Sequence, residues 1–141
     1  ATNFGRFLDL LGPKGHNVKL AGMCDQGEET AFRRAIEEGG IGSGLDRASM
    51  ESLGFFVCVS DLEDELFRAL GPDRFVDLIA AQGQLKKFRN FQNQPAHRHK
   101  THHRQLWDWL GTHKLPYAWL MVAALPSNAV PPPLRGVLAQ I

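Results

Sequence analysis

Two acidic residues occupy positions where a metal site for phosphodiester cleavage could form. Asp25 directly follows the apolar run 18–24, and Glu63 comes shortly after the apolar run 55–59. If the two runs are neighbouring parallel strands, both carboxylates lie at the edge of the sheet where open α/β sheets bind ligands. Carboxylate oxygens suit Mg²⁺ or Mn²⁺, and two such ions about 4 Å apart can activate water and stabilise a leaving oxygen. We therefore expect Asp25 and Glu63 to bind metal.

Acids that follow strands also serve as helix caps, and this second interpretation competes with the first. Asp and Glu are favoured in the first turn of a helix because they interact with its dipole. We favour capping for Glu29, Asp64 and Glu65, and a functional site for Asp25 and Glu63.

The periodicity of the apolar residues predicts the elements that would position these acids. Runs 18–24 and 55–59 are typical of strands buried on both faces of a parallel sheet. Helical spacing predicts helices near residues 3–11, 28–38, 61–70, 73–82, 104–110 and 116–125, with Thr2 or Asn3 and Ser49 as caps. The alternation indicates an α/β fold, but two strands are few for such a sheet. Either another strand is hidden in an apparent loop, or one precedes the sequence.

Length and composition indicate one soluble domain. The chain has 141 residues, 43% of them hydrophobic, which is enough for a single core. No stretch approaches the roughly 18–20 apolar residues of a membrane span. Cys24 and Cys58 lie within the apolar runs, so we expect core thiols in a reducing, cytoplasmic compartment and exclude a disulfide framework.

The charges are divided along the chain, although the formal net charge is only +1. Thirteen of the fifteen acids fall between Asp25 and Asp77, whereas residues 78–107 contain no acid. This pattern suggests an acidic cluster for cations and a basic flank for DNA phosphates, although solvated helix faces also produce it. The candidate phosphate-binding residues are Lys86, Lys87, Arg89, Arg98, Lys100 and Arg104.

Three segments together resemble the later part of a TOPRIM domain. They are LAGMCDQGEE at residues 20–29, FFVCVSDLEDEL at residues 55–66 and HKLPYA at residues 113–118. The resemblance is to the TOPRIM domains of OLD-family (overcoming lysogenisation defect) nucleases and their small stand-alone bacterial relatives. It implies a single domain over residues 1–141, with a TOPRIM-like (Rossmann-like), mostly parallel sheet flanked by helices and a helical C-terminal part.

The resemblance also implies roles for individual residues. Asp25 matches the first acid of an Asp-x-Asp motif, which binds metal in the family. Glu63 matches the acid of a later Leu-Glu motif that binds a second metal, and Asp61 beside it is a secondary candidate. Lys114 matches a lysine that stabilises the transition state, as a cation near a charged phosphorane would. The alternative for Lys114 is a solvated lysine at a helix start.

The sequence departs from the family pattern in two places. Gly27 replaces the second acid of Asp-x-Asp, so Glu28 from the next position is the candidate substitute. The first strand of the family, which ends in a catalytic glutamate, has no counterpart before Asp25, where Asp9 is the sole acid. We therefore expect the parent protein to continue upstream and this chain to be catalytically incomplete.

Two further patterns favour structural roles. The histidines in residues 97–104 have poor spacing for zinc, and an exposed basic loop fits them better. Phe88, Phe91 and the tryptophans Trp107, Trp109 and Trp119 fit core packing. The Gly-rich loop 39–44 lacks the lysine of an ATP-binding loop, so an ATPase would act from another domain or in trans.

The sequence thus predicts a metal-dependent DNA endonuclease or nickase of the OLD-like TOPRIM type, using Mg²⁺ or Mn²⁺. The alternative is a non-catalytic nucleic-acid-binding or regulatory module that keeps a decayed TOPRIM site, as Gly27 suggests.

Overall fold

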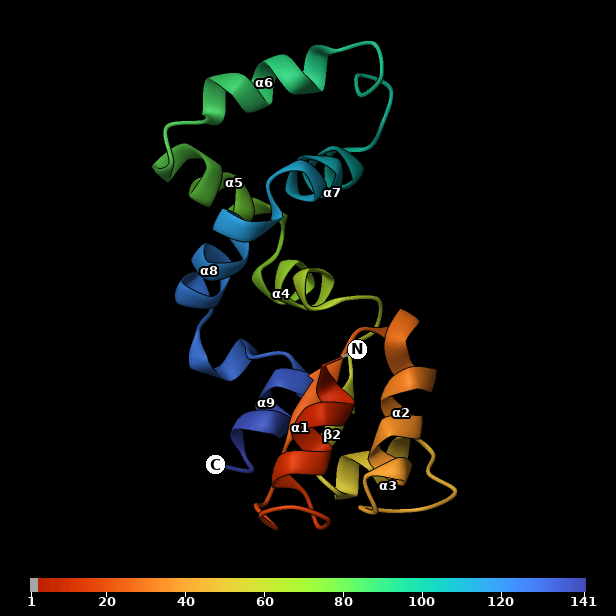
Figure 1. Ribbon diagram of the computed structural model, residues 1–141. Helices are drawn as coiled ribbons and strands as arrows, with labels where there is room; N and C mark the ends of the chain where they lie inside the picture. The colour runs from red at the N-terminus through yellow and green to blue at the C-terminus, as the bar shows by residue number, and fades with distance from the viewer. Residues whose placement is uncertain (1–2) are drawn as a thin grey trace. The chain divides into compact units, whose positions relative to one another are not determined.

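The computed structural model describes residues 3–141 as two compact units (Figure 1). Unit 1 comprises the chain up to Glu65 together with Pro131–Ile141, and unit 2 comprises Leu66–Val130. Helix α4 (Leu62–Leu70) begins in unit 1 and continues into unit 2. Each unit is described separately below.

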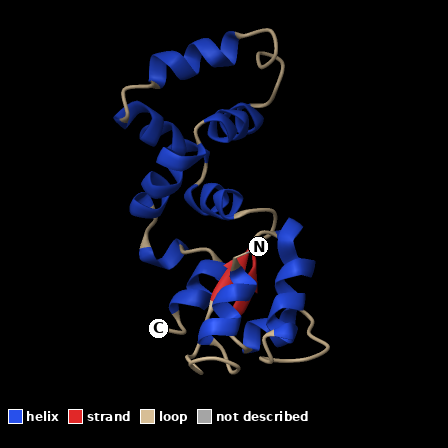
Figure 2. Cartoon of the chain, in the orientation of Figure 1, coloured by secondary structure: helices blue, strands red, loops and turns tan. Residues whose placement is uncertain are grey.

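Unit 1 contains a parallel pair of short strands. β1 (Gly22–Cys24) pairs with β2 (Phe55–Val57), with Gly22 opposite Phe55 and Cys24 opposite Val57. Figure 2 shows both strands surrounded by helices. This confirms a mixed α/β architecture in which the two apolar runs are neighbours. Within residues 3–141 these are the only strands, so the described part of the chain contains no hidden third strand.

Both strands are shorter than predicted. Asn17 has a positive φ of 51°, and the N–H of Val18 donates to the carbonyl of Leu11 at 2.7 Å. This hydrogen bond holds the start of the apolar run 18–24 against the end of helix α1 (Phe4–Leu11) instead of in the sheet. Val18 is exposed, as is Val59 beyond the end of β2. The prediction that both runs are buried throughout is therefore wrong at these ends.

Helices enclose the strands of unit 1. They are α1, the 3₁₀ turn η1 (Gln26–Glu28), α2 (Glu29–Glu38), α3 (Arg47–Ser52) and α9 (Pro132–Leu138). Phe4 stacks on Phe32 with ring centroids 4.5 Å apart, and both meet the ring of Phe55 edge-on. Ile36 and Met50 complete this core and are fully buried. The predicted apolar face of α2 is thus confirmed at Phe32 and Ile36.

The predicted caps require correction. Asp46, not Ser49, is the N-cap of α3, and its carboxylate accepts the Ser49 N–H at 2.8 Å. Ser49 closes the capping box from the third helical position, where its hydroxyl accepts the Asp46 N–H. Asn3 precedes α1 but makes no side-chain cap bond. Thr2 lies outside the described residues.

Unit 2 is helical. It contains most of α4, then α5 (Pro72–Ala81), α6 (Leu85–Asn93), α7 (His102–Thr112), α8 (Lys114–Ala124) and the 3₁₀ turn η2 (Ser127–Ala129). Phe75, Phe88, Leu106 and Met121 are fully buried. None of the helices that the described residues form combines the length and apolar character needed to cross a bilayer.

Aromatic residues follow the packing prediction only in part. Phe88 is buried as expected, and Trp109 is almost completely buried against it with ring centroids 5.4 Å apart. Trp119, in contrast, projects from α8 with 77% of its surface exposed. Core packing is therefore the wrong prediction for Trp119, which lies on the solvent side of a helix whose inner face carries Tyr117 and Met121.

Candidate functional site

Hydrogen bonds hold the carboxyl ends of β1 and β2 together beyond the sheet. The N–H of Cys58 donates to the Cys24 carbonyl at 2.9 Å, and the N–H of Gln26 donates to the Ser60 carbonyl at 2.9 Å. The Gln26 side chain returns the contact by accepting the Ser60 N–H at 3.3 Å. Asp25 precedes Gln26 and Asp61 follows Ser60. The two aspartates therefore stand at neighbouring strand ends, as predicted.

The first turn of α4 offers backbone N–H groups to both aspartates. The backbone N–H of Leu62 donates to the Asp25 carboxylate, and that of Asp64 donates to Asp61 Oδ1 at 2.8 Å. Helix N-termini leave such N–H groups unpaired and attract negative charge. Asp61 thus caps its own helix, and Asp25 reaches the same helix start from a strand 37 positions earlier in the chain.

Four predicted metal-binding acids influence one another electrostatically. Partial desolvation raises the pKa of Asp25, and repulsion from Asp61, Glu63 and Glu28 raises it further, whereas the hydrogen bond from Leu62 lowers it. Asp25 remains solvent-exposed as a residue, so water screens part of this repulsion. Asp25 therefore lies within electrostatic range of the three other acids proposed as metal ligands.

The acids assigned to helix starts lie in first turns as predicted, and two of them make further structural contacts. Glu65 is buried, and its Oε1 accepts the N–H of Val59 at 2.7 Å, across the turn in which Ser60 takes a positive φ of 88°. Glu29 binds Arg47 through two contacts, at 2.9 and 2.6 Å. Glu65 therefore fixes the turn that sets the position of Asp61, and Glu29 ties α2 to α3.

The donor chemistry of the four acids suits a hard cation, because every side chain offers carboxylate oxygens. Their arrangement is open: across residues 3–141 no group of three or more His, Cys, Asp or Glu side chains is already placed to hold a metal ion. Asp25 and Asp61 direct carboxylate oxygens toward α4 N–H groups. Each carboxylate still has lone pairs for a second partner, since its two oxygens offer about four.

The predicted phosphate-binding residues all lie in unit 2. Lys86, Lys87 and Arg89 are exposed on α6, while the segment between α6 and α7 and the start of α7 carry the other three, Arg98, Lys100 and Arg104. Unit 2 has nine Lys and Arg against three acids, a formal charge of +6, and unit 1 has seven against twelve, a formal charge of −5. The charge division read from the sequence thus follows the structural division.

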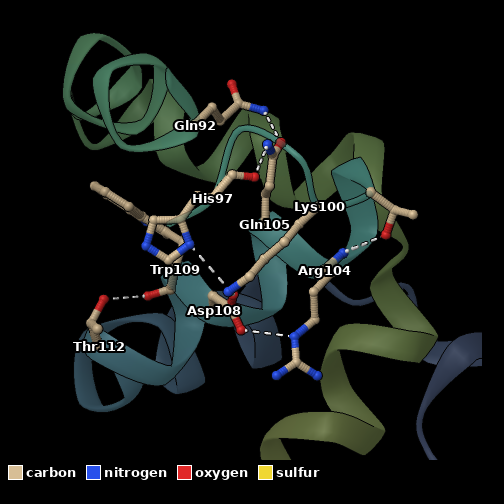
Figure 3. A network of polar contacts seen from close by, with 9 residues as sticks. Gln92, His97, Lys100, Arg104, Gln105, Asp108, Trp109 and Thr112 are labelled. Atoms are coloured by element: carbon tan, nitrogen blue, oxygen red, sulfur yellow. Dashed lines mark hydrogen bonds and ion pairs between the residues drawn. The ribbon is translucent and has the colours of Figure 1, made fainter. Parts of the chain in front are cut away.

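Sequence analysis missed an acid within this basic region. Asp108, on α7, contacts Lys100 Nζ through Oδ2 at 2.6 Å and Arg104 Nε through Oδ1 at 3.0 Å (Figure 3). His97 Nδ1 lies 3.5 Å from Oδ2. The hydrogen bond from Lys100, with the charge of Arg104, lowers the pKa of Asp108. Two of the six predicted phosphate ligands therefore already bind a carboxylate.

Packing and amide hydrogen bonds hold the segment before α7 in place, and Figure 3 shows the amide hydrogen bonds of Gln92 and Gln105. The His97 ring stacks on Phe91 with centroids 3.8 Å apart, and Gln105 Nε2 donates to the His97 carbonyl at 2.9 Å. Gln92 donates to Gln105 at 2.8 Å. His97 is thus partly buried, unlike the exposed loop predicted for this run, whereas His99, His102 and His103 are exposed as expected.

Lys114 is exposed at the first position of α8 in unit 2. The four predicted metal-binding acids belong to unit 1, whereas Lys114 belongs to unit 2.

Comparisons of the chain with protein-family models, with curated proteins and with solved structures returned no match. Function is therefore inferred from the residues and their geometry.

Proposed function

We propose that Asp25, Glu28, Asp61 and Glu63 form a divalent-cation site and that the protein is a metal-dependent DNA endonuclease or nickase of the OLD-like TOPRIM type. The observation that carries this proposal is the position of Asp25 at the carboxyl end of a parallel strand pair, where desolvation and repulsion from neighbouring acids raise its pKa. In open α/β sheets this end is where ligands bind.

Crowded carboxylates favour a cation for an electrostatic reason. Like charges close together destabilise the ionised state, and a bound Mg²⁺ or Mn²⁺ would convert that repulsion into attraction. Hard cations that keep several waters need only a few carboxylates plus substrate phosphate. The open arrangement of the four acids is compatible with such a site.

The residues of this chain would share the catalytic work. Asp25 and Glu63 would hold the ion, with Asp61 and Glu28 assisting, and the Leu62 N–H would keep the Asp25 carboxylate oriented. When bound, the ion supplies an activated water and stabilises charge on the leaving oxygen. The cations of unit 2 would bind the DNA backbone.

A nicking assay tests this function directly. Supercoiled plasmid is incubated with the protein and Mn²⁺, and relaxed product is measured for the unchanged protein, Asp25→Asn, Glu63→Gln and Asp9→Asn. We expect the first two substitutions to reduce nicking by about 100-fold or more. Asp9→Asn is the control, because Asp9 is an exposed acid on α1. Nicking at the unchanged rate in Asp25→Asn and Glu63→Gln would contradict the proposed roles.

The alternative function is a non-catalytic, DNA-binding or regulatory module. The bonds from Leu62 to Asp25 and from Asp64 to Asp61 favour it, because they give both aspartates a purely structural use. Gly27 in place of a second motif acid favours it as well. A module of this kind would bind DNA equally well with and without Mn²⁺, and it would bind no Mn²⁺ that depends on Asp25.

A further inference from the structure

The carboxylate of Asp108 stands alone in a basic part of the chain. Asp108 is the only acid between residue 78 and the end of the sequence. Its side chain is 16% exposed, whereas those of its partners Lys100 and Arg104 are 37% and 62% exposed. Both cations are thus partly exposed to solvent even while they contact Asp108.

We propose that Lys100 and Arg104 form a binding site for a DNA backbone phosphate and that Asp108 occupies this site as an internal competitor in the free protein. The inference rests on the DNA binding proposed above and adds to it a named site and a residue that limits its affinity.

The geometry resembles the binding of an oxyanion. Lys100 and Arg104 approach different oxygens of one carboxylate, Oδ2 and Oδ1, as two cations would approach two oxygens of a phosphate. Arg104 uses only Nε for this contact, and Figure 3 shows its two terminal nitrogens pointing away from Asp108. A phosphate could therefore bind at the terminal nitrogens first and then take the place of the carboxylate.

The charge of Asp108 is expected to oppose this binding. It cancels one of the two positive charges at the site and repels an incoming phosphate. The Asp108 side chain is only 16% exposed, so an incoming polyanion must also compensate for the ion pairs that this carboxylate loses. Substitution of Asp108 by an uncharged residue should therefore strengthen DNA binding instead of weakening it.

Several contacts of the surrounding scaffold do not involve Asp108, although His97 Nδ1 lies 3.5 Å from its Oδ2. The segment before α7 is held by the Gln105 bond to the His97 carbonyl, by the bond between Gln92 and Gln105, and by stacking of His97 on Phe91. Thr101 caps α7 by accepting the Arg104 N–H at 3.3 Å. Asp108→Asn should therefore leave Lys100 and Arg104 in place while releasing both from the carboxylate.

The primary experiment measures the anisotropy of a short, fluorescently labelled duplex DNA titrated with the full chain at several salt concentrations. We expect Asp108→Asn to bind DNA about three- to tenfold more tightly than the unchanged protein, with a steeper salt dependence of about one additional released counterion per freed cation. Asp77→Asn is the matched control, since Asp77 is an exposed acid of the same unit and its substitution makes the same change in net charge. It should change affinity less than about twofold.

Two further variants test the site with Asp108 in place. Lys100→Gln and Arg104→Gln should each weaken DNA binding about two- to fivefold, and the loss should be larger in the Asp108→Asn background. Lys14→Gln in unit 1 is the control and should have no effect. Circular dichroism establishes that each variant is folded.

The outcomes separate this inference from the proposed function. If the unchanged protein binds DNA but Asp108→Asn binds no better than Asp77→Asn, or if neither Lys100→Gln nor Arg104→Gln weakens binding, the inference is wrong and DNA binding stands. If neither the unchanged protein nor Asp108→Asn binds DNA at low salt, both the inference and the DNA-binding part of the proposed function are wrong.

Discussion

The backbone N–H of Leu62 donates a hydrogen bond to the carboxylate of Asp25. This bond joins the end of β1 to the first residue of α4, and Glu63 is the next residue along that helix. The repulsion that Glu63 exerts on Asp25 follows from this junction. The proximity of Asp25 and Glu63 thus depends on the N-terminus of α4 lying against the carboxyl end of β1.

Asp25→Asn should stabilise the folded protein at neutral pH in the absence of metal. The pKa of Asp25 is raised above its ordinary value of 3.8, so ionisation of this carboxyl destabilises the folded protein. The full destabilisation is present at pH values above the pKa of the folded state, and it is absent at pH values below the pKa of the unfolded state. Asparagine keeps an acceptor for Leu62 but removes the charge. We expect the melting temperature at pH 7 to rise by about 1–2 °C and the gain to vanish near pH 3. A lower melting temperature at pH 7 would show that neighbouring acids do not destabilise this carboxylate.

Gly136→Ala should destabilise unit 1. A Cβ on Gly136 would lie 2.3 Å from the ring of Phe56, closer than atoms can approach, so α9 or the ring must move. We expect a loss of about 1–3 kcal/mol in the free energy of unfolding, measured by urea denaturation. Gly5→Ala in α1 is the control, because a Cβ there meets nothing within 4 Å and alanine favours the helix. Adding Phe56→Ala should remove much of the effect of the clash, and equal stability of the two glycine variants would contradict this packing.

Cys24 and Cys58 should resist alkylation in the folded protein. Burial, together with nearby acidic groups, raises the pKa of Cys24 to about 12 and that of Cys58 to about 11, from an ordinary 9.0. Since the thiolate is the reactive form, iodoacetamide at pH 8 should modify both at least about 100-fold more slowly in buffer than in denaturant. Mass spectrometry of each peptide over time provides the measurement. Rapid labelling of either cysteine in the native state would contradict this prediction, because it would require an accessible thiol whose pKa is not raised.

The elements that the sequence predicted well are those with strong local periodicity. The apolar face of α2 places Phe32 and Ile36 in the core. The two apolar runs pair in parallel as predicted, and this places Asp25 and Asp61 at neighbouring strand ends. Strand ends were less predictable because Val18 is held by the end of α1, a contact that no local pattern reveals. Trp119 was misassigned because residue type alone does not say which face of α8 is buried.

The polar contacts of the candidate sites were the least predictable. The bond from Leu62 to Asp25 and that from Val59 to Glu65 depend on the turn at Ser60, whose positive φ is rare for a residue other than glycine. Asp108 directly follows the acid-free stretch 78–107. Its separation from Arg104 is four residues, typical of a helical ion pair, so this contact had a signal in the sequence.

Cation binding by the acids around Asp25 is the central claim, and isothermal titration with Mn²⁺ tests it most directly. The unchanged chain, Asp25→Asn, Glu63→Gln and the control Asp9→Asn are titrated under identical conditions. We expect the unchanged chain and Asp9→Asn to bind Mn²⁺ alike, and Asp25→Asn and Glu63→Gln to lose at least about tenfold in affinity. Equal affinity in all four proteins, or no binding by the unchanged chain, would contradict a metal site at these acids.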